Sequence, residues 1–371
     1  MDSELIIKEL DVVLLIKGCN YYERSTLVRL VRYWFRGLFI LKYVCSLSIY
    51  IATIKFNAEH LFTMINIWFE GTLLLMYLYF VFRQGQFKRL FEDMLSLCFV
   101  HQRQSIRRVT RWLAFFALTY AVVFLMAKAV GWYGLGTLQF VQMEMNLVFT
   151  QVDGSHYLLA IVSSLFFALC SWSSITSILY ILYVYLIKKM NDGYFGTVAI
   201  AAVKARNFHQ LRLHWLEICR LKDRFERLAS FFPFFWFANT FMKCTGAVVA
   251  SKIDTINQKS IIRGQWIVMS NWICYSVDML SEMFTLIFVD HVERHIKQSA
   301  DDFVYNLVKS MPVHDDRQAE KLIRELERDA NLKLTGWSFF DLKRNLILSL
   351  IGAAIPFTVL FVQLIDTSHS E

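Results

Sequence analysis

The stretch LTGWSFFDLKRNLILSLIGAAIPFTVLFVQLI, from Leu334 to Ile365, decides the class of fold. A charged approach that ends at Arg344 is followed by an apolar segment holding a single glutamine, Gln363, near its outer end. As a helix, residues 345–366 would rise roughly 33 Å, enough to cross the ~30 Å hydrocarbon core of a bilayer. The sequence therefore predicts a membrane helix at this end of the chain.

Small and polar residues recur along one face of this helix at steps of three and four. The members of this stripe are Ser349, Gly352, Pro356, Val359 and Gln363. The bulky residues Leu346, Leu350, Phe357 and Phe361 face elsewhere. Such a stripe is typical of a pore wall, and it is equally typical of a face that packs on a neighbouring membrane helix.

The same segment resembles the last transmembrane helix of the insect gustatory receptors, which reads Thr-Tyr, five hydrophobic residues, Gln-Phe. Pro356-Phe357, the five residues that follow, and Gln363-Leu364 fit this frame with the same spacing. Only the glutamine is identical, because Pro-Phe stands in place of Thr-Tyr and Leu in place of the final Phe. The run before it also resembles the family's approach to that helix, at Leu334-Thr335, Phe339-Phe340, Asp341 and Leu346 to Gly352.

The resemblance implies an all-α membrane protein with seven transmembrane helices that forms a ligand-gated, non-selective cation channel as a homo- or heterotetramer. Residues 1–344 would form the ligand-binding six-helix region with cytoplasmic anchor helices, and residues 345–371 the pore helix and a short extracellular tail. Residues carried over to the pore and gate are Gln363, Leu364, Pro356, Val359 and Leu360. The implied role is taste reception in the plasma membrane of sensory neurons, leading to acceptance or avoidance of a small-molecule tastant.

Composition supports the membrane class independently. The chain is 56% hydrophobic and 16% aromatic, with three prolines in 371 residues, and its mean hydropathy is +0.41. These values exclude an ordinary soluble domain. Apolar windows long enough to span lie at about 34–54, 61–82, 112–133, 157–187, 229–250, 262–290 and 345–366.

Basic residues set the expected orientation. The segments before the first window and after the second, fourth and sixth carry 31 Lys and Arg, whereas the alternate segments carry 4. The basic side is cytoplasmic by the positive-inside rule. The amino terminus is then inside and the carboxyl terminus outside. Contact with anionic lipid accounts for the net charge of +8 without a nucleic-acid partner.

Two segments on the basic side, about 188–228 and 291–344, carry apolar residues at helical spacing. The stripes are Phe208, Leu211, Trp215, Ile218, Phe225 and Leu228 in the first, and Ala319, Leu322, Ile323 and Leu326 in the second. Glu320 precedes Arg324 by four residues, a spacing that favours an ion pair on a helix. The resemblance implies an intracellular anchor where four subunits meet. The alternative is a pair of helices on the membrane surface.

Charged and aromatic residues within the windows are candidates for a ligand pocket, because intramembrane polar groups are costly and mark function. The candidates are Trp68, Glu70, Lys128, Trp132, Asn239, Lys243, Trp266 and Asn271. Asp278 and Glu282 add two carboxylates to the sixth window. The alternative is that the aromatics line the membrane interface and the charges pair with one another.

Catalysis, a cofactor and a metal are not expected. The sequence HVERH at residues 291–295 lacks the HExxH order, and there is no Gly-rich phosphate loop, GxSxG or CxxC motif. An odorant-type or non-conducting chemoreceptor subunit that needs a partner is the alternative function, and a transporter is a third. Pro356 removes a helical N–H, so conduction by this chain alone stays open.

Overall fold

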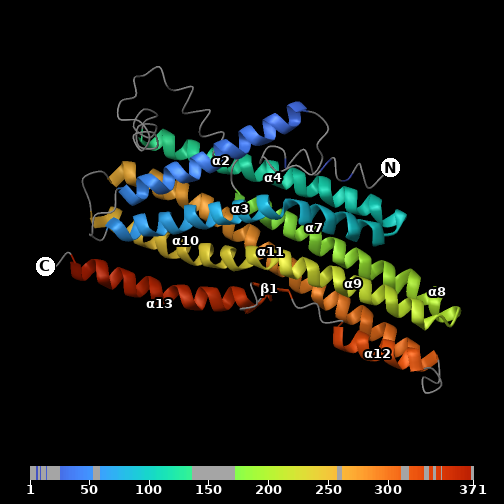
Figure 1. Ribbon diagram of the computed structural model, residues 1–371. Coiled ribbons are helices and arrows are strands. Elements are labelled where there is room, and N and C mark those ends of the chain that lie inside the picture. Colours follow the sequence, from blue (N-terminus) through green and yellow to red (C-terminus); the bar gives the residue numbers. More distant parts are fainter. Residues whose placement is uncertain are drawn as a thin grey trace.

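The computed structural model describes residues 26–52, 59–135, 172–256, 261–310, 317–329, 334–336, 340–343 and 345–368, together with Ile6, Glu9 and Leu14. Long helices run side by side through an elongated bundle (Figure 1). The helices are α2 (Thr26–Ala52), α3 (Glu59–Leu97), α4 (Val100–Leu135), α7 (Trp172–Gly193), α8 (Ala199–Lys204), α9 (Phe208–Ala229), α10 (Phe231–Ile256), α11 (Ile261–Ser310), α12 (Arg317–Asp329) and α13 (Asn345–Ser368). A short π-helix, η2 (Tyr194–Val198), joins α7 to α8.

The predicted helical class is confirmed. Every predicted apolar window overlaps one helix: α2, α3, α4, α7, α10, α11 and α13 in chain order. Residues 157–171 of the fourth window lie outside the described residues. Among the helices described, none meets both the length and the apolarity that a bilayer crossing requires. The seven crossings and their direction stay predictions.

A two-stranded sheet corrects the expectation of a purely helical chain. Strand β1 (Thr335–Gly336) pairs antiparallel with β2 (Phe340–Asp341), and Thr335 lies opposite Asp341. Two-residue strands are too short to produce an alternating sequence pattern. The sheet lies immediately before α13 and contacts α10 through β1.

Two helices hold the bundle together. α11 packs against α4, α7, α10 and α12, and α10 packs against α3, α11 and α13. Two prolines lie within these two helices and α13. Pro233 lies in the first turn of α10, where its missing N–H costs no helical bond, and Pro356 lies inside α13.

The core where α3, α7 and α9 meet is aromatic. Tyr183 of α7 stacks on Phe225 of α9 at a centroid distance of 5.3 Å and meets Phe91 of α3 edge-on at 5.8 Å. The Tyr183 hydroxyl donates to the carbonyl oxygen of Phe87 at 2.7 Å. Aromatic pairs in these geometries add to the burial energy of each ring, so this core fixes the three helices relative to one another.

The two predicted amphipathic stripes are buried inside this one chain. Of the first stripe, Phe208, Leu211, Trp215, Ile218 and Phe225 are buried and Leu228 is partly buried; all four residues of the second are buried. α12 packs against α9 and α11 of the same chain. Burial of these faces therefore needs no second subunit, so they are not themselves the surface on which an anchor would assemble.

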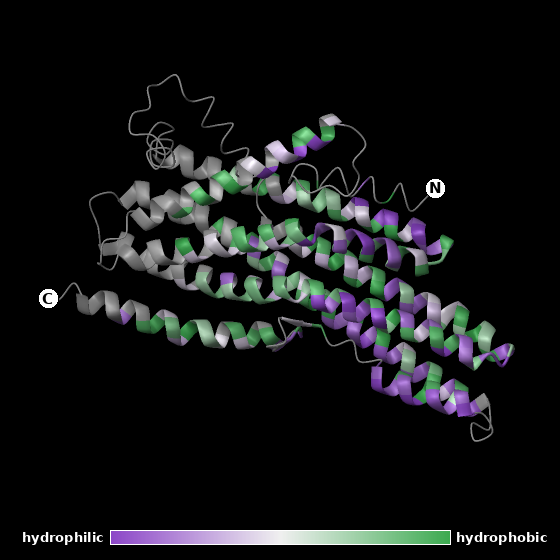
Figure 2. Ribbon diagram, viewed as in Figure 1, coloured by the Kyte–Doolittle hydropathy of each residue, from purple (hydrophilic) through white to green (hydrophobic). Residues whose placement is uncertain are grey.

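Ion pairs fasten α12 from its polar side. The Arg212 guanidinium on α9 donates to both carboxylate oxygens of Glu325, its Nε at 2.9 Å from each. The predicted pair between Glu320 and Arg324 is also formed. Figure 2 shows hydrophilic residues gathered over α9 and α12, whereas α13 is mostly apolar.

Replacing Leu322 tests the burial of α12 within the chain. Leu322→Ala removes a fully buried side chain, and it should lower the free energy of unfolding by about 2–5 kcal/mol. The unfolding temperature of the purified protein reports this loss. Leu213→Ala on the solvent side of α9, where the leucine is 52% exposed, is the matched control and should shift it little. Equal unfolding temperatures for both variants would contradict the packing described.

Candidate functional site

Helix α13 is attached to the bundle along one edge. Among the described elements it packs against α10, where Ala354 is buried. The Phe357 ring meets Phe241 of α10 edge-on at a centroid distance of 5.2 Å. Because one side of the helix carries these contacts, most of the described side chains of α13 are exposed in the single chain, and the helix lies at the edge of the bundle (Figure 1).

The predicted pore stripe lies on the uncovered side. Its members Ser349, Gly352, Pro356, Val359 and Gln363 are all exposed, and so is Leu360. By the 3.6-residue period they lie opposite Ala354. The Leu364 side chain lies outside the described residues. A helix that exposes this much apolar surface needs lipid or another chain to cover it.

Pro356 changes the hydrogen bonding of the stripe. It has no N–H to donate to the carbonyl oxygen of Gly352, one turn earlier, although α13 continues through it. Nothing lies within 4 Å of the position that a Cβ of Gly352 would take. The uncovered face of α13 therefore includes a backbone carbonyl without its helical donor.

The sheet at the base of α13 is held by a buried carboxylate. Glu226, in the last turn of α9, accepts the backbone N–H of Thr335 at 2.9 Å and also accepts its hydroxyl. Burial raises the pKa of the Glu226 carboxyl to about 7, although the hydrogen bonds from Thr335 favour the charged form. A titratable group thus sits between the end of α9 and the segment that leads into α13.

Buried polar contacts connect the helices around α10. The Thr72 hydroxyl of α3 donates to Asn239 Oδ1 of α10 at 2.6 Å, and Trp236 Nε1 of α10 donates to the Thr176 hydroxyl of α7 at 2.8 Å. The Thr240 hydroxyl of α10 donates to Glu282 of α11.

A further contact joins α4 to α11, because the Tyr120 hydroxyl donates to Asp278. Asp278 and Glu282 are 5% and 7% exposed. Each of these two carboxylates of α11 thus accepts a hydrogen bond from a different neighbouring helix. Since an unpaired buried carboxylate is costly, these bonds select one mutual position of α4, α10 and α11.

Two predicted pocket residues have described side chains. Asn239 is 1% exposed, and within the described part of the chain its Nδ2 group donates to no acceptor. Trp68 is 43% exposed and borders an apolar groove of about 460 Å³ between α3, α10 and α13. The other residues lining the groove are Phe234, Phe237, Ala238, Phe241, Met242 and Leu350. Asn239 is not among them, so the structure does not place these two candidates in one groove.

The remaining six candidates are on the helices expected for them, but their side chains lie outside the described residues. They are Glu70, Lys128, Trp132, Lys243, Trp266 and Asn271. The sequence reasoning missed Thr72, Tyr120 and Thr240 as partners of the polar core. The four-residue spacing of Asp278 and Glu282 indicates that both face one way, but it does not indicate which hydroxyls meet them.

Comparison with known structures identifies the fold. The insect olfactory receptor OR5 from Machilis hrabei in complex with eugenol superposes with a TM-score of 0.69 at 14% identity, over 98% of this chain and 100% of that one. The chain has an insect olfactory receptor fold. A second structure of OR5 gives a TM-score of 0.68 at 13% identity, over 97% of this chain and 98% of that one. Neither family models nor curated protein sequences match the chain.

The likeness to insect chemoreceptors predicted from the last helix is thereby confirmed at the level of the fold. It extends over nearly the whole chain, although the identity is low. The structures compared are olfactory receptors, so the likeness does not distinguish a taste receptor from an odorant receptor.

Glu226 makes stability depend on pH. Its pKa of about 7 in the folded chain lies above the ordinary 4.5, so the folded state binds more protons between these values and stability falls as pH rises through them. Glu226→Gln keeps a carbonyl oxygen for Thr335 and carries no charge. Its unfolding temperature should therefore exceed that of the parent at about pH 8 and lose the advantage at about pH 5.

The matched control is Glu327→Gln, which changes an exposed carboxylate on α12. In thermal unfolding across the pH series, the unfolding temperature of this variant should differ from that of the parent by the same amount at every pH. The same constant difference for Glu226→Gln would mean that the pKa of Glu226 does not change on folding.

Proposed function

We propose that the chain is a chemoreceptor subunit that forms a ligand-gated cation channel in the plasma membrane of sensory neurons. One observation carries the proposal. α13 is an apolar helix fastened to α10 along one edge, and its uncovered side bears the Ser349, Gly352, Pro356, Val359 and Gln363 stripe. The insect olfactory receptor fold supports it, because OR5 is an olfactory receptor and therefore a chemoreceptor.

Assembly around α13 would complete the pore. Four copies with their stripes facing a common axis would cover the exposed surface, as symmetric assembly requires. Gln363 would then form a ring of four amides, and Leu364 with Leu360 an apolar constriction that closes by dewetting. The Gly352 carbonyl, without a helical donor at Pro356, would add an oxygen to the wall of the pore.

Membrane insertion is supported by the sequence rather than by the geometry. Each of the seven apolar windows overlaps a helix in the described part of the chain, and 31 Lys and Arg lie on one side of the windows against 4 on the other. In the proposed arrangement the amino terminus, α9 and α12 are cytoplasmic, and α13 ends outside. In this arrangement residues 1–344 form the ligand-binding part, and residues 345–371 form the pore helix and the short tail after it.

A small organic molecule is the proposed ligand, and OR5 was determined in complex with one, eugenol. In the proposal, α10 transmits ligand binding to the pore helix α13. It carries Asn239 and Thr240 in the polar core and Phe241, which touches α13. A ligand that binds the open state more tightly would shift α10 and so move α13.

Two finer functions have separate support. The frame around Gln363 resembles the gustatory receptors and supports taste reception. The superposition on OR5 supports an odorant-type receptor. A subunit that conducts only with a partner belongs to the same alternative. Currents evoked by volatile or by non-volatile compounds, from this chain alone and with co-expressed subunits, separate these alternatives.

Labelling of single engineered cysteines tests the orientation. A cysteine at His369 should react with a membrane-impermeant reagent on intact cells, because the carboxyl terminus is outside. A cysteine at Asp2 should react only after permeabilisation. The opposite pattern would reverse the proposed topology.

Current recordings test the pore assignment. Leu364→Ala should widen the constriction and raise the cation current without ligand, and Gln363→Ala should change ion selectivity or conductance more than the ligand concentration for half response. Ile355→Ala is the control, since Ile355 is exposed on α13 outside the stripe. The subunit combination used must reach the cell surface.

If the Leu364→Ala and Gln363→Ala channels keep the resting current and ion selectivity of the parent, α13 does not line the pore. The chain would then be a non-conducting receptor. Ligand-driven uptake without channel current would instead favour a transporter.

A further inference from the structure

An exposed face of α4 changes character along its length. Arg108 and Arg111 are exposed near its start. Trp112, Phe115 and Phe116 follow, each between 57% and 58% exposed. Leu118, Val122 and Met126 continue the face and are 60%, 51% and 64% exposed. The order basic, aromatic, aliphatic is that of a surface passing from water through the headgroup layer into hydrocarbon.

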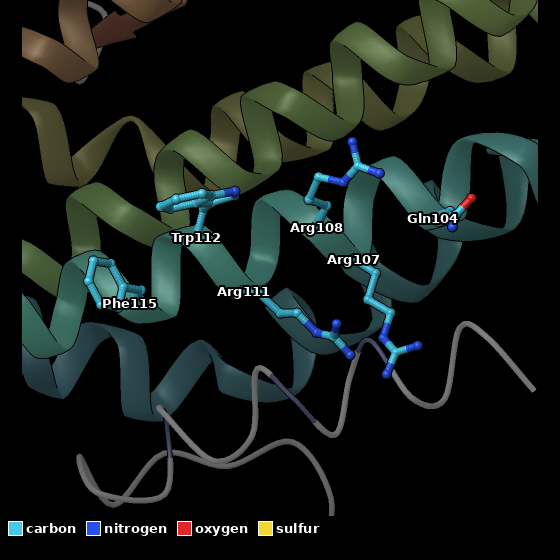
Figure 3. A pocket seen from close by; sticks show the side chains of 6 residues that line it. All are labelled: Gln104, Arg107, Arg108, Arg111, Trp112 and Phe115. Atoms are coloured by element: carbon cyan, nitrogen blue, oxygen red, sulfur yellow. The ribbon is translucent and has the colours of Figure 1, made fainter.

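Two ridges of side chains at four-residue spacing shape this region. One ridge is Gln104, Arg108 and Trp112, and the other is Arg107, Arg111 and Phe115. Together they line a hollow of about 520 Å³, which we call the α4 hollow. Figure 3 looks onto this face and shows Arg108 and Trp112 along its upper edge and Arg107 and Arg111 along its lower edge.

Trp112 and Phe115 close the apolar end of the hollow. Their rings meet edge-to-face at a centroid distance of 6.1 Å. Tryptophan at such a position presents an apolar ring to lipid and an N–H to the headgroup layer. Each ridge therefore runs from a polar or charged side chain to an aromatic one over about two helical turns.

Within the described part of the chain, one carboxylate partly compensates the positive charge of the hollow. Glu9 Oε1 accepts from Arg107 Nε at 2.9 Å and from Arg111 Nε at 3.1 Å. A single carboxylate thus serves two guanidinium groups, while Arg108 extends from the other ridge. Among the residues that the structure describes at the hollow, three arginines stand against one carboxylate, an excess of two positive charges.

We propose that the α4 hollow binds the headgroup of an anionic phospholipid of the cytoplasmic leaflet. Arg108 and Arg111 would donate to the phosphate, since arginine forks match its oxygens. The acyl chains would lie along Phe115, Leu118 and Val122. The proposal rests on the proposed function for the membrane placement of α4.

Charge and continuity favour a lipid over a protein partner. The excess positive charge needs an anion, and the adjoining face needs hydrocarbon at the same time. A phospholipid supplies both in one molecule, and the cytoplasmic leaflet is where anionic lipid is abundant. The predicted third window begins at residue 112, the point at which the arginines give way to Trp112.

Lipid retention by the purified full-length protein tests the proposal. Protein reconstituted with phosphatidylcholine and phosphatidylserine is re-purified, and the lipids that remain bound are counted by native mass spectrometry. The parent should retain phosphatidylserine in preference to phosphatidylcholine. Arg108→Gln should reduce this preference about fivefold, the effect of one basic residue near an anionic surface. Arg108→Lys keeps the charge but loses the two parallel N–H donors of the guanidinium group. Its preference for phosphatidylserine should lie between those of the parent and of Arg108→Gln.

Arg220→Gln is the matched control, because Arg220 is an exposed arginine on α9 away from the hollow. It should retain phosphatidylserine as the parent does. Equal retention of both lipids by the parent, or unchanged preference in Arg108→Gln, would overturn the proposal. Binding of soluble glycerophosphoserine as strong as that of the lipid would also overturn it. Retention is measured without current, so a chain that binds lipid but does not conduct would contradict only the channel function.

Discussion

The arrangement of the bundle depends on the need of two buried carboxylates for donors. Asp278 and Glu282 lie four residues apart on α11 and receive hydroxyls from Tyr120 of α4 and Thr240 of α10. Apolar packing between helices tolerates sliding, because many positions bury similar areas. A buried carboxylate tolerates far less, since losing its donor leaves the desolvation cost uncompensated. These bonds therefore set the register of α4, α10 and α11, and through α10 they set the position of α13.

Much of the helical layout was predictable from residues 334–365 and from the apolar windows. Each window overlaps a helix because long apolar runs leave the backbone few alternatives. The stripes of α9 and α12 were predictable for the same kind of reason, since the period of an amphipathic helix is visible in the sequence. Their burial partner was not predictable. Leu322 needs an apolar neighbour, but periodicity does not indicate whether α9 of the same chain or another subunit supplies it.

The candidate site was predictable only where one helix determines it. The exposed stripe of α13 follows from spacing along a single helix, whereas the contacts of Asn239 depend on how α3 lies against α10. The β1–β2 sheet escaped prediction because its strands are two residues long. Glu226 escaped for a related reason. Its hydrogen bonds to Thr335 connect positions far apart in the chain. The sequence around Glu226 shows only a glutamate in a charged helix, which does not predict these bonds or its burial.

The length of α11 has a mechanical consequence. α11 is one continuous helix of 50 residues, and it contacts α4 and α10 as well as α12. At the helical rise it is roughly 75 Å long, so a tilt of about 5° about one end displaces the other end by about 6.5 Å. A rotation too small to disturb the side chains around Asp278 would thus be magnified at α12. Communication along the molecule then requires no relay of successive side-chain movements, because the stiffness of a single helix is sufficient.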